Sequence, residues 1–284
     1  MELRPTWKFM EAASHSPKFI YGTAWKKDAT ADLVKMAAAT GFRAIDTANQ
    51  PRHYDEPLVG RALEALAGED VARSSLFIQT KFTPLDGHDH RVPYNPDLDL
   101  KDQVAQSFES SLRHLHTDYL DSFLLHGPYT SRGLGSSDWE VWGAIEEIHR
   151  SGRARIIGIS SVNAEQVRLL ATNARIKPMV VQNRCFANRG WDRDVREICR
   201  NHGIMYQGFS LLTANRNVVR HPIVLSVARR LGVQPEQVVF RFAMQVGMVP
   251  LTGTTSEAHM KEDLGVFAIQ LTSEEVEIIE SIEG

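Results

Sequence analysis

Eight short β-type runs alternate with amphipathic helical patterns along most of this 284-residue chain. Most of the runs are almost continuously apolar, which is typical of strands covered on both faces. Strands that alternate with helices in this way indicate a parallel sheet. We predict strands at Lys18–Gly22, Phe42–Asp46, Phe77–Lys81, Ser122–His126, Arg155–Ser160, Met179–Asn183, Met205–Phe209 and Met248–Leu251.

The segments between the strands carry apolar residues at three- and four-residue steps, as amphipathic helices do. Thr30 is the predicted N-cap of the first helix, and Gly41 is its predicted C′ residue. One loop, from Phe82 to Leu100, is unusually long, and loops of that length are usually functional or mobile. The predicted helices are Ala31–Thr40, Leu58–Leu66, Lys101–Leu115, Trp139–Arg150, Ala164–Thr172, Asp194–Asn201, Pro222–Leu231, Pro235–Gln245, Glu257–Leu264 and Ser273–Ile282.

This order of elements predicts an α/β fold, a (β/α)₈ TIM barrel that forms a single domain over residues 1–284. The competing architecture is an open, doubly wound sheet, which usually carries phosphate-binding glycines after its first strand. Here the first strand leads into Gly22-Thr23-Ala24-Trp25, which is not a GxGxxG sequence. We therefore favour the barrel, whose functional residues lie on the loops at the carboxyl ends of the strands.

Composition narrows the class of protein further. The chain is 43% hydrophobic and carries a formal net charge of −3, so nothing suggests a nucleic-acid partner. It has two cysteines, no apolar signal core at its N-terminus, and no run of about 18 apolar residues. We expect a soluble, cytoplasmic protein with no membrane partner, and the oligomeric state stays open.

Three consecutive predicted strands end in residues that can move or steer a proton. The strands end at Asp46, Lys81 and His126, and Tyr54 lies in the loop after the first of them. Because the carboxyl ends of neighbouring parallel strands meet at one mouth of a barrel, we expect these side chains to lie together. Each residue alone is more often structural than catalytic, but the combination favours an enzyme.

Together these four residues form an acid that can protonate a carbonyl oxygen. The phenol of Tyr54 has an ordinary pKa of about 10, and we expect the ammonium of Lys81 to lower it. Asp46 holds Lys81 charged and in position. His126 donates a hydrogen bond to the substrate oxygen and orients it.

Three motifs carry a resemblance to a known family. Gly41–Ala48 followed by Tyr54 and Glu56 resembles the start of the aldo-keto reductase signature. Asp118–Pro128 is similar to the histidine motif of that family, and Ile157–Asn163 resembles its cofactor motif on the fifth strand. The three motifs occur in the order that the family has.

The resemblance implies a (β/α)₈ fold and a nicotinamide cofactor, NADP or NAD, that is bound without a Rossmann domain. It implies reduction of a small-molecule aldehyde or ketone to an alcohol, with Asp46, Tyr54, Lys81 and His126 as the catalytic tetrad. Ser160 and Gln182 hold the nicotinamide carboxamide, and Phe209 stacks on its ring. Trp25 and His126 face the substrate. The rest of the implied cofactor site comprises Thr23, Asp46, Ser161, Ser210, Leu211, Gly253, Thr254, His259 and Asp263.

The chain departs from the family pattern in several places. Asp46 and Tyr54 are eight residues apart, more than in the usual motif, so the intervening segment must bulge for Tyr54 to reach the site. Ser161 stands where the family commonly has Asn. Gly253 and His259 occupy positions where NADP-preferring members have Lys and Arg, which weakens the case for strict NADPH use. The chain ends at Gly284 without a long closing loop, which predicts an open pocket.

Two other functions are compatible with parts of the sequence. A barrel that binds the cofactor as a redox sensor or regulatory subunit is the main alternative, although it would not need the acid. A metal-dependent hydrolase that uses His88 and His90 is weaker, because no spaced third ligand accompanies them. We therefore expect no metal site.

Overall fold

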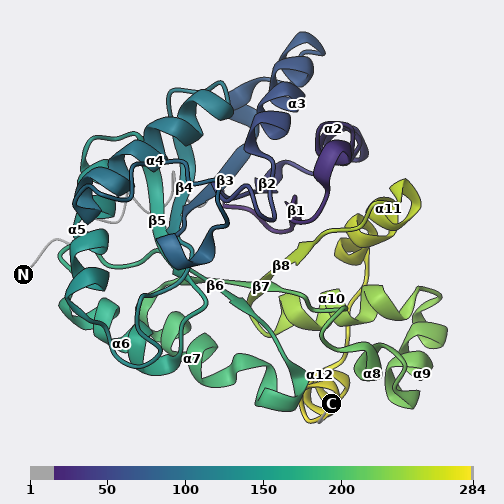
Figure 1. The fold of residues 1–284 in the computed structure, drawn as a ribbon. Helices are drawn as coiled ribbons and strands as arrows, with labels where there is room; N and C mark the ends of the chain where they lie inside the picture. The colour runs from purple at the N-terminus through teal and green to yellow at the C-terminus, as the bar shows by residue number, and fades with distance from the viewer. Residues whose placement is uncertain (1–15, 283–284) are drawn as a thin grey trace, which may run out of the picture.

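The computed structural model describes residues 16–282, and in it eight parallel strands close into a barrel in the order β1 to β8. Each strand pairs with its two neighbours, and β1 pairs with β8 to close the ring. Figure 1 shows the helices arranged around the outside of this ring. The strands are β1 (Ile20–Gly22), β2 (Ala44–Asp46), β3 (Phe77–Phe82), β4 (Leu120–Leu125), β5 (Ala154–Ser160), β6 (Val180–Arg184), β7 (Met205–Phe209) and β8 (Met248–Thr252).

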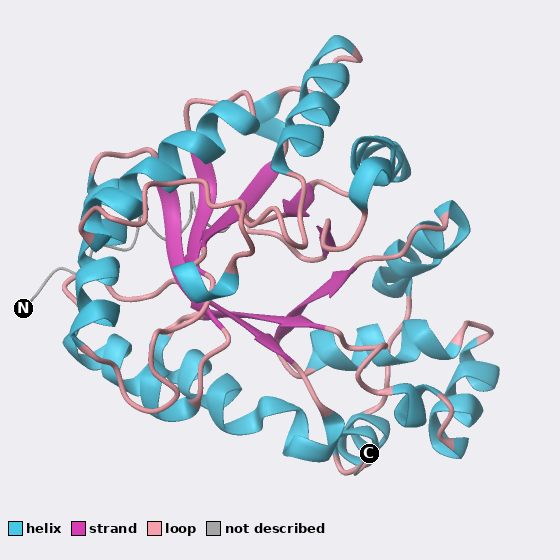
Figure 2. Ribbon diagram, viewed as in Figure 1, coloured by secondary structure: helices cyan, strands magenta, loops and turns pink. Residues whose placement is uncertain are grey.

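The helices form an outer layer around the strands, as the colouring of Figure 2 makes clear. Their apolar faces pack against the outer face of the sheet in one continuous core. The helices are α2 (Thr30–Thr40), α3 (Glu56–Gly68), α4 (Leu100–His114), α5 (Ser136–Arg150), α6 (Ala164–Asn173), α7 (Arg193–His202), α8 (Arg216–Val219), α9 (Pro222–Leu231), α10 (Pro235–Gln245), α11 (Glu257–Gly265) and α12 (Ser273–Glu280).

The barrel and the order of its elements confirm the fold class that the sequence predicts. The differences lie at the ends of elements, in the four-residue helix α8 and in short 3₁₀ helices, none of which was predicted. Thr30 is not an N-cap: it is the first helical residue of α2, and its hydroxyl donates to Lys27 O (2.6 Å). Gly41 does end α2, with a φ of 125° that a residue with a side chain rarely adopts.

The inside of the barrel changes from apolar to polar along the strands. Ile20, Ala44, Phe77 and Leu251 form a small buried cluster in its lower part. Two residues further along β3, Gln79 pairs in register with Asp46, and Lys81 follows. Functional polar groups are therefore supported from below by a packed apolar layer, and they lie towards the carboxyl ends of the strands, as in other barrels of this type.

Candidate active site

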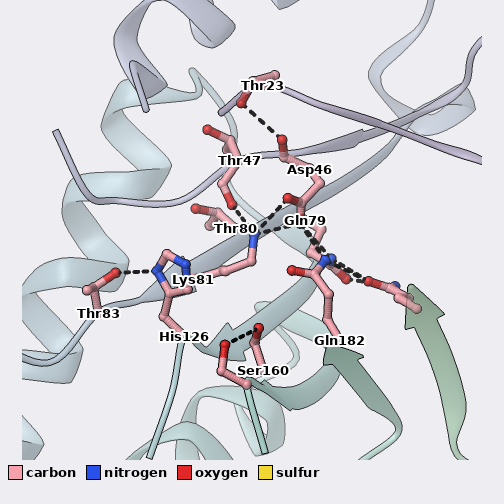
Figure 3. Close-up of polar contacts among 12 residues, drawn as sticks. Thr23, Asp46, Thr47, Gln79, Thr80, Lys81, Thr83, His126, Ser160 and Gln182 are labelled. Atoms are coloured by element: carbon pink, nitrogen blue, oxygen red, sulfur yellow. Dashed lines mark hydrogen bonds and ion pairs between the residues drawn. The ribbon is translucent and has the colours of Figure 1, made fainter. Parts of the chain in front are cut away.

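A buried ion pair forms the centre of the site. Nζ of Lys81 lies 2.7 Å from Oδ1 and 2.8 Å from Oδ2 of Asp46, and it also donates to Thr47 O (2.7 Å). Lys81 is fully buried and Asp46 nearly so. Burial lowers the pKa of Lys81, and the adjacent carboxylate opposes that effect. All three N–H bonds of the ammonium are therefore used inside the protein, as Figure 3 shows.

Three glutamines from three strands surround the same carboxylate. Nε2 of Gln79 (2.7 Å) and Nε2 of Gln182 (3.0 Å) both donate to Oδ1 of Asp46. Oε1 of Gln207 accepts from both amides, and its Nε2 donates back to Oε1 of Gln79 (3.1 Å). Together with the two bonds from Lys81, the Asp46 carboxylate accepts four hydrogen bonds, which fix its position. We call Asp46, Gln79, Gln182 and Gln207 the amide network.

The segment between Asp46 and Tyr54 bulges, as the long spacing predicts. Tyr54 N donates to Gln50 O (3.1 Å), which folds the segment into a compact turn. Nε2 of Gln50 donates to Gly87 O (2.6 Å), and Trp25 N donates to His53 O (2.7 Å). The inserted residues are thus held by two neighbouring loops, and they deliver Tyr54 to the mouth of the barrel.

Tyr54 lies next to the other three residues of the predicted tetrad. The centre of its ring is 5.4 Å from Nζ of Lys81 and 5.9 Å from the centre of the His126 ring. The tetrad predicted from the strand ends therefore does assemble at one place. Within residues 16–282, the Tyr54 hydroxyl has no hydrogen-bond partner, so its proton is available to a ligand.

The expectation that Lys81 lowers the pKa of Tyr54 is wrong for this structure. Burial raises the pKa of Tyr54 well above its usual value, and the negative charge of Asp46 raises it further. Lys81 does not contribute to this shift, and its ammonium is paired with the Asp46 carboxylate at 2.7 Å. Tyr54 is therefore a neutral phenol, which is the form that donates a proton.

His126 directly follows β4, and it lies beside Thr83, which directly follows β3. Its Nδ1 is 2.7 Å from Oγ1 of Thr83. Burial lowers the pKa of His126 well below its usual value, and the charge of Lys81 adds to the effect. The imidazole is therefore neutral near pH 7, and it has one N–H bond to donate.

A cavity of about 780 Å³ opens directly above this group. It runs from Tyr54 and His126 to the start of α11. Thr23 and Lys81 do not line it: the Thr23 hydroxyl donates instead to Asp46 O (3.0 Å). The other residues of the site predicted from sequence all line the cavity, namely Trp25, Asp46, Tyr54, His126, Ser160, Ser161, Gln182, Phe209, Ser210, Leu211, Gly253, Thr254, His259 and Asp263.

The cavity suits a nicotinamide dinucleotide. Phe209 offers an aromatic face, and the hydroxyls of Ser160 and Ser161 lie 3.3 Å apart beside it. Nε2 of Gln182 is held by the amide network, so its Oε1 is the atom left to meet a carboxamide. The far end lies at the N-terminus of α11, where helix amides favour a phosphate. These residues fit the cofactor that the sequence predicts.

Sequence reasoning missed several residues of the site. Lys26 lines the far end of the cavity, and its Nζ donates to Gly253 O. Glu236 and Glu262 line the same end. Lys26 and Gly253 are 227 positions apart, so no local pattern in the sequence could have revealed their contact. Gln207 carried a weak signal, since it is a polar residue inside an otherwise apolar strand, whereas Gln79 is followed by Thr80 and Lys81 in β3.

His88, in the long loop, makes its contacts within the protein. Nε2 of His88 lies 3.0 Å from Thr83 O, and its ring packs against Tyr94. In the part of the chain that the structure describes, no group of three histidine, cysteine or acidic side chains is placed to hold a metal ion. His88 is a structural residue in this loop.

The barrel is closed, and a neutral phenol and a neutral imidazole lie above a buried ion pair at its mouth. A cavity of the size of a dinucleotide adjoins them. Together these features define a class of protein, the nicotinamide-dependent oxidoreductases. The sequence model of the Aldo/keto reductase family matches residues 14–283. The chain belongs to this family, and it is an NAD(P)-dependent reductase of aldehydes or ketones. The resemblance seen in the three motifs is thereby confirmed.

Individual relatives agree with the family assignment. The chain is 30% identical to the uncharacterized oxidoreductase YtbE of Bacillus subtilis over 88% of its own length and 82% of that protein. It is 29% identical to the glyoxal reductase of Bacillus subtilis, with 88% and 82% covered. Among solved structures, an aldo-keto reductase of Bombyx mori in complex with NADP is similar, with 25% identity, a TM-score of 0.78, and 93% and 88% covered.

Proposed function

We propose that this protein reduces its carbonyl substrate with Tyr54 as the proton donor and His126 as the group that orients the substrate oxygen. A bound nicotinamide cofactor supplies the hydride. Lys81 and Asp46 form the buried ion pair that fixes the floor of the site, and the amide network holds Asp46 in place. Trp25, at the mouth of the cavity, contacts the substrate.

One observation supports this assignment of roles more than any other. Tyr54 and His126 are both neutral hydrogen donors, both line the cavity, and their rings are 5.9 Å apart. A carbonyl oxygen that lies between two such donors is polarised before the reaction, and its developing negative charge is stabilised afterwards. A regulatory barrel would need the cofactor cavity but not this pair.

The test is to replace Tyr54 by phenylalanine, which removes the hydroxyl and keeps the ring. We expect kcat for a test aldehyde to fall by about 10²–10⁴-fold, while cofactor affinity stays unchanged. Tyr119→Phe is the matched control, because its buried hydroxyl has no hydrogen-bond partner in the described chain and it does not line the cavity. Turnover by Tyr54→Phe at the rate of the unmodified enzyme would show that another group supplies the proton.

The remaining expectations from the sequence belong to the same proposal. We infer a single domain over the whole chain, a cytoplasmic location, and no nucleic-acid partner. None of the described helices is long and apolar enough to cross a membrane. Separate titrations with NADH and NADPH, followed by a screen of aldehydes and ketones with the tighter cofactor, would identify the preferred cofactor and the substrate class.

A further inference from the structure

Thr83 contacts the imidazole ring of His126 at Nδ1 and not at Nε2. Its side chain is buried, and its Oγ1 lies 2.7 Å from Nδ1 of His126 (Figure 3). Among residues 16–282, neither the Thr83 hydroxyl nor Nε2 of His126 has another hydrogen-bond partner. The two side chains therefore form a closed pair, with Nε2 left for a ligand.

Two proton arrangements are possible for this pair. If Nδ1 of His126 carries the proton, it donates to Thr83, and Nε2 can only accept. The Thr83 O–H is then buried without an acceptor, which carries a desolvation cost. If Nε2 carries the proton, the buried Thr83 hydroxyl donates to Nδ1, and the one polar hydrogen without a partner in the described chain is Nε2–H of His126, a residue that lines the cavity. Only this second form can donate a hydrogen bond to a carbonyl oxygen.

We propose that Thr83 is a positioning residue that holds His126 as its Nε2–H tautomer. The Thr83 hydroxyl donates to Nδ1, and Nε2–H then points its hydrogen bond at the substrate oxygen. This inference rests on the proposed function for its catalytic consequence, but the tautomer itself is a property of the protein alone.

Other residues of the long loop Phe82–Leu100 hold Thr83 in place. The backbone oxygen of Thr83 accepts hydrogen bonds from the Tyr94 hydroxyl (2.9 Å) and from Nε2 of His88 (3.0 Å). Gly87 packs against its methyl group so closely that a Cβ there would lie 2.6 Å from Cγ2 of Thr83. Two hydrogen bonds thus fix the backbone of Thr83, and Gly87 confines its methyl group, so that the loop orients the hydroxyl towards His126.

Two substitutions change the pair in different ways. Thr83→Val keeps the shape of the side chain and removes the donor, whereas Thr83→Ser keeps the donor. Gly87→Ala leaves both partners intact, but its Cβ would lie 2.6 Å from Cγ2 of Thr83, so we expect the Thr83 side chain to shift and its hydroxyl to turn away from His126. Ser122→Ala is the matched control, because Ser122 has a buried hydroxyl on β4 that has no hydrogen-bond partner in the described chain.

The experiment is ¹⁵N NMR of histidine-labelled protein, with the His126 signals assigned by comparison with a His126→Asn sample. We expect the Nε2–H tautomer in the unmodified protein, in Thr83→Ser and in Ser122→Ala. Thr83→Val and Gly87→Ala should shift the Nδ1 resonance and show a fraction of the Nδ1–H form. In the same two variants kcat should fall by about three- to tenfold, with cofactor affinity unchanged.

Two results would overturn the inference. One is an Nδ1–H tautomer in the unmodified protein, and the other is an Nδ1 resonance that does not respond to Thr83→Val or to Gly87→Ala. Because the tautomer is read without turnover, it stands even if Tyr54→Phe shows the proposed acid to be wrong. Gly87→Ala keeps the test valid if Thr83→Val does not fold.

Discussion

Tyr54 and His126 are uncharged for the same physical reason: burial penalises the charged form of each. The buried charges nearby include those of Lys81 and Asp46, which form an ion pair at 2.7 Å. The mouth of the barrel thus presents two neutral donors to a neutral carbonyl group. Such donors stabilise the negative charge that develops on the oxygen during hydride transfer, without binding a stray anion beforehand.

Lys26 places an ammonium at the far end of the cavity, where it donates to Gly253 O. We predict that Lys26→Met weakens NADPH binding by about tenfold or more, because a charge-assisted hydrogen bond contributes roughly 1.5–3 kcal/mol. Quenching of intrinsic tryptophan fluorescence during a titration would measure the affinity.

The control for this prediction is the neighbouring lysine. Lys27 is exposed and does not line the cavity, so Lys27→Met should leave NADPH affinity unchanged. Equal dissociation constants for NADPH in the Lys26 and Lys27 variants would mean that Lys26 only hydrogen-bonds to Gly253 and does not contribute to cofactor binding.

At the residue scale, the sequence allowed us to predict those site residues whose positions follow from the order of the strands. Asp46, Lys81 and His126 were predictable because each ends a strand or directly follows one, and parallel strands bring those ends to one mouth. The pKa of Tyr54 was not predictable, because it depends first on how deeply the phenol is buried and then on its distance from the charge of Asp46. Contacts such as that between Lys26 and Gly253 depend on barrel closure, which joins the first strand to the last.

At the scale of elements, the amide network ties four strands together inside the barrel. Asp46 belongs to β2, Gln79 to β3, Gln182 to β6 and Gln207 to β7. Gln79 and Gln207 exchange two hydrogen bonds across the interior, at 2.7 and 3.1 Å. An open sheet would not bring β3 and β7 face to face, so the network is a direct product of closure.

We predict that Gln207→Met destabilises the protein by about 1–3 kcal/mol, because it leaves the buried Oε1 of Gln79 without its donor. Gln79→Met should cost a similar amount. The double variant should cost less than the sum of the two, since both polar groups are then replaced by apolar ones. Urea unfolding of the four proteins in a double-mutant cycle would measure the coupling, and strictly additive losses would contradict the prediction.

The existence of the strands was predictable from the sequence for a simple reason, but the residues at which they begin and end were not predictable. The near-continuous apolar runs identify strands covered on both faces, and all eight exist. Their bounds depend on pairing: β1 and β2 are only three residues long, because that is the length over which each finds partners. Helix α8 was missed because four residues carry too little periodicity.

At the scale of the whole molecule, closure of the barrel also has an electrostatic cost to stability, at the cofactor end of the cavity. Asp263, on α11, is buried there, and burial raises its pKa to about 6. Glu262 and Glu236 add to the shift, while Thr252 and His259 oppose it. An acid whose pKa is higher in the folded protein than in the unfolded chain destabilises the fold once it is ionised.

The sign of the pH dependence follows from this shift. Below a pH of about 4, Asp263 is protonated in both the folded and the unfolded states and costs nothing. Between pH 4 and 6 the unfolded chain releases the proton while the folded protein keeps it, so the cost grows and then levels off above pH 6. Asp263→Asn should therefore raise the free energy of unfolding by about 1–3 kcal/mol at pH 7.5 and by almost nothing at pH 4.

Urea unfolding of the two proteins at a series of pH values would measure this difference. A gain of the same size at pH 4 and pH 7.5 would show that asparagine stabilises through packing or hydrogen bonds and not through the removal of charge. A gain that appears only as the pH rises would assign the cost to the buried carboxylate. The same carboxylate lines the cavity. With Asp263 at this position the barrel is less stable, but it keeps a charge that faces the cofactor.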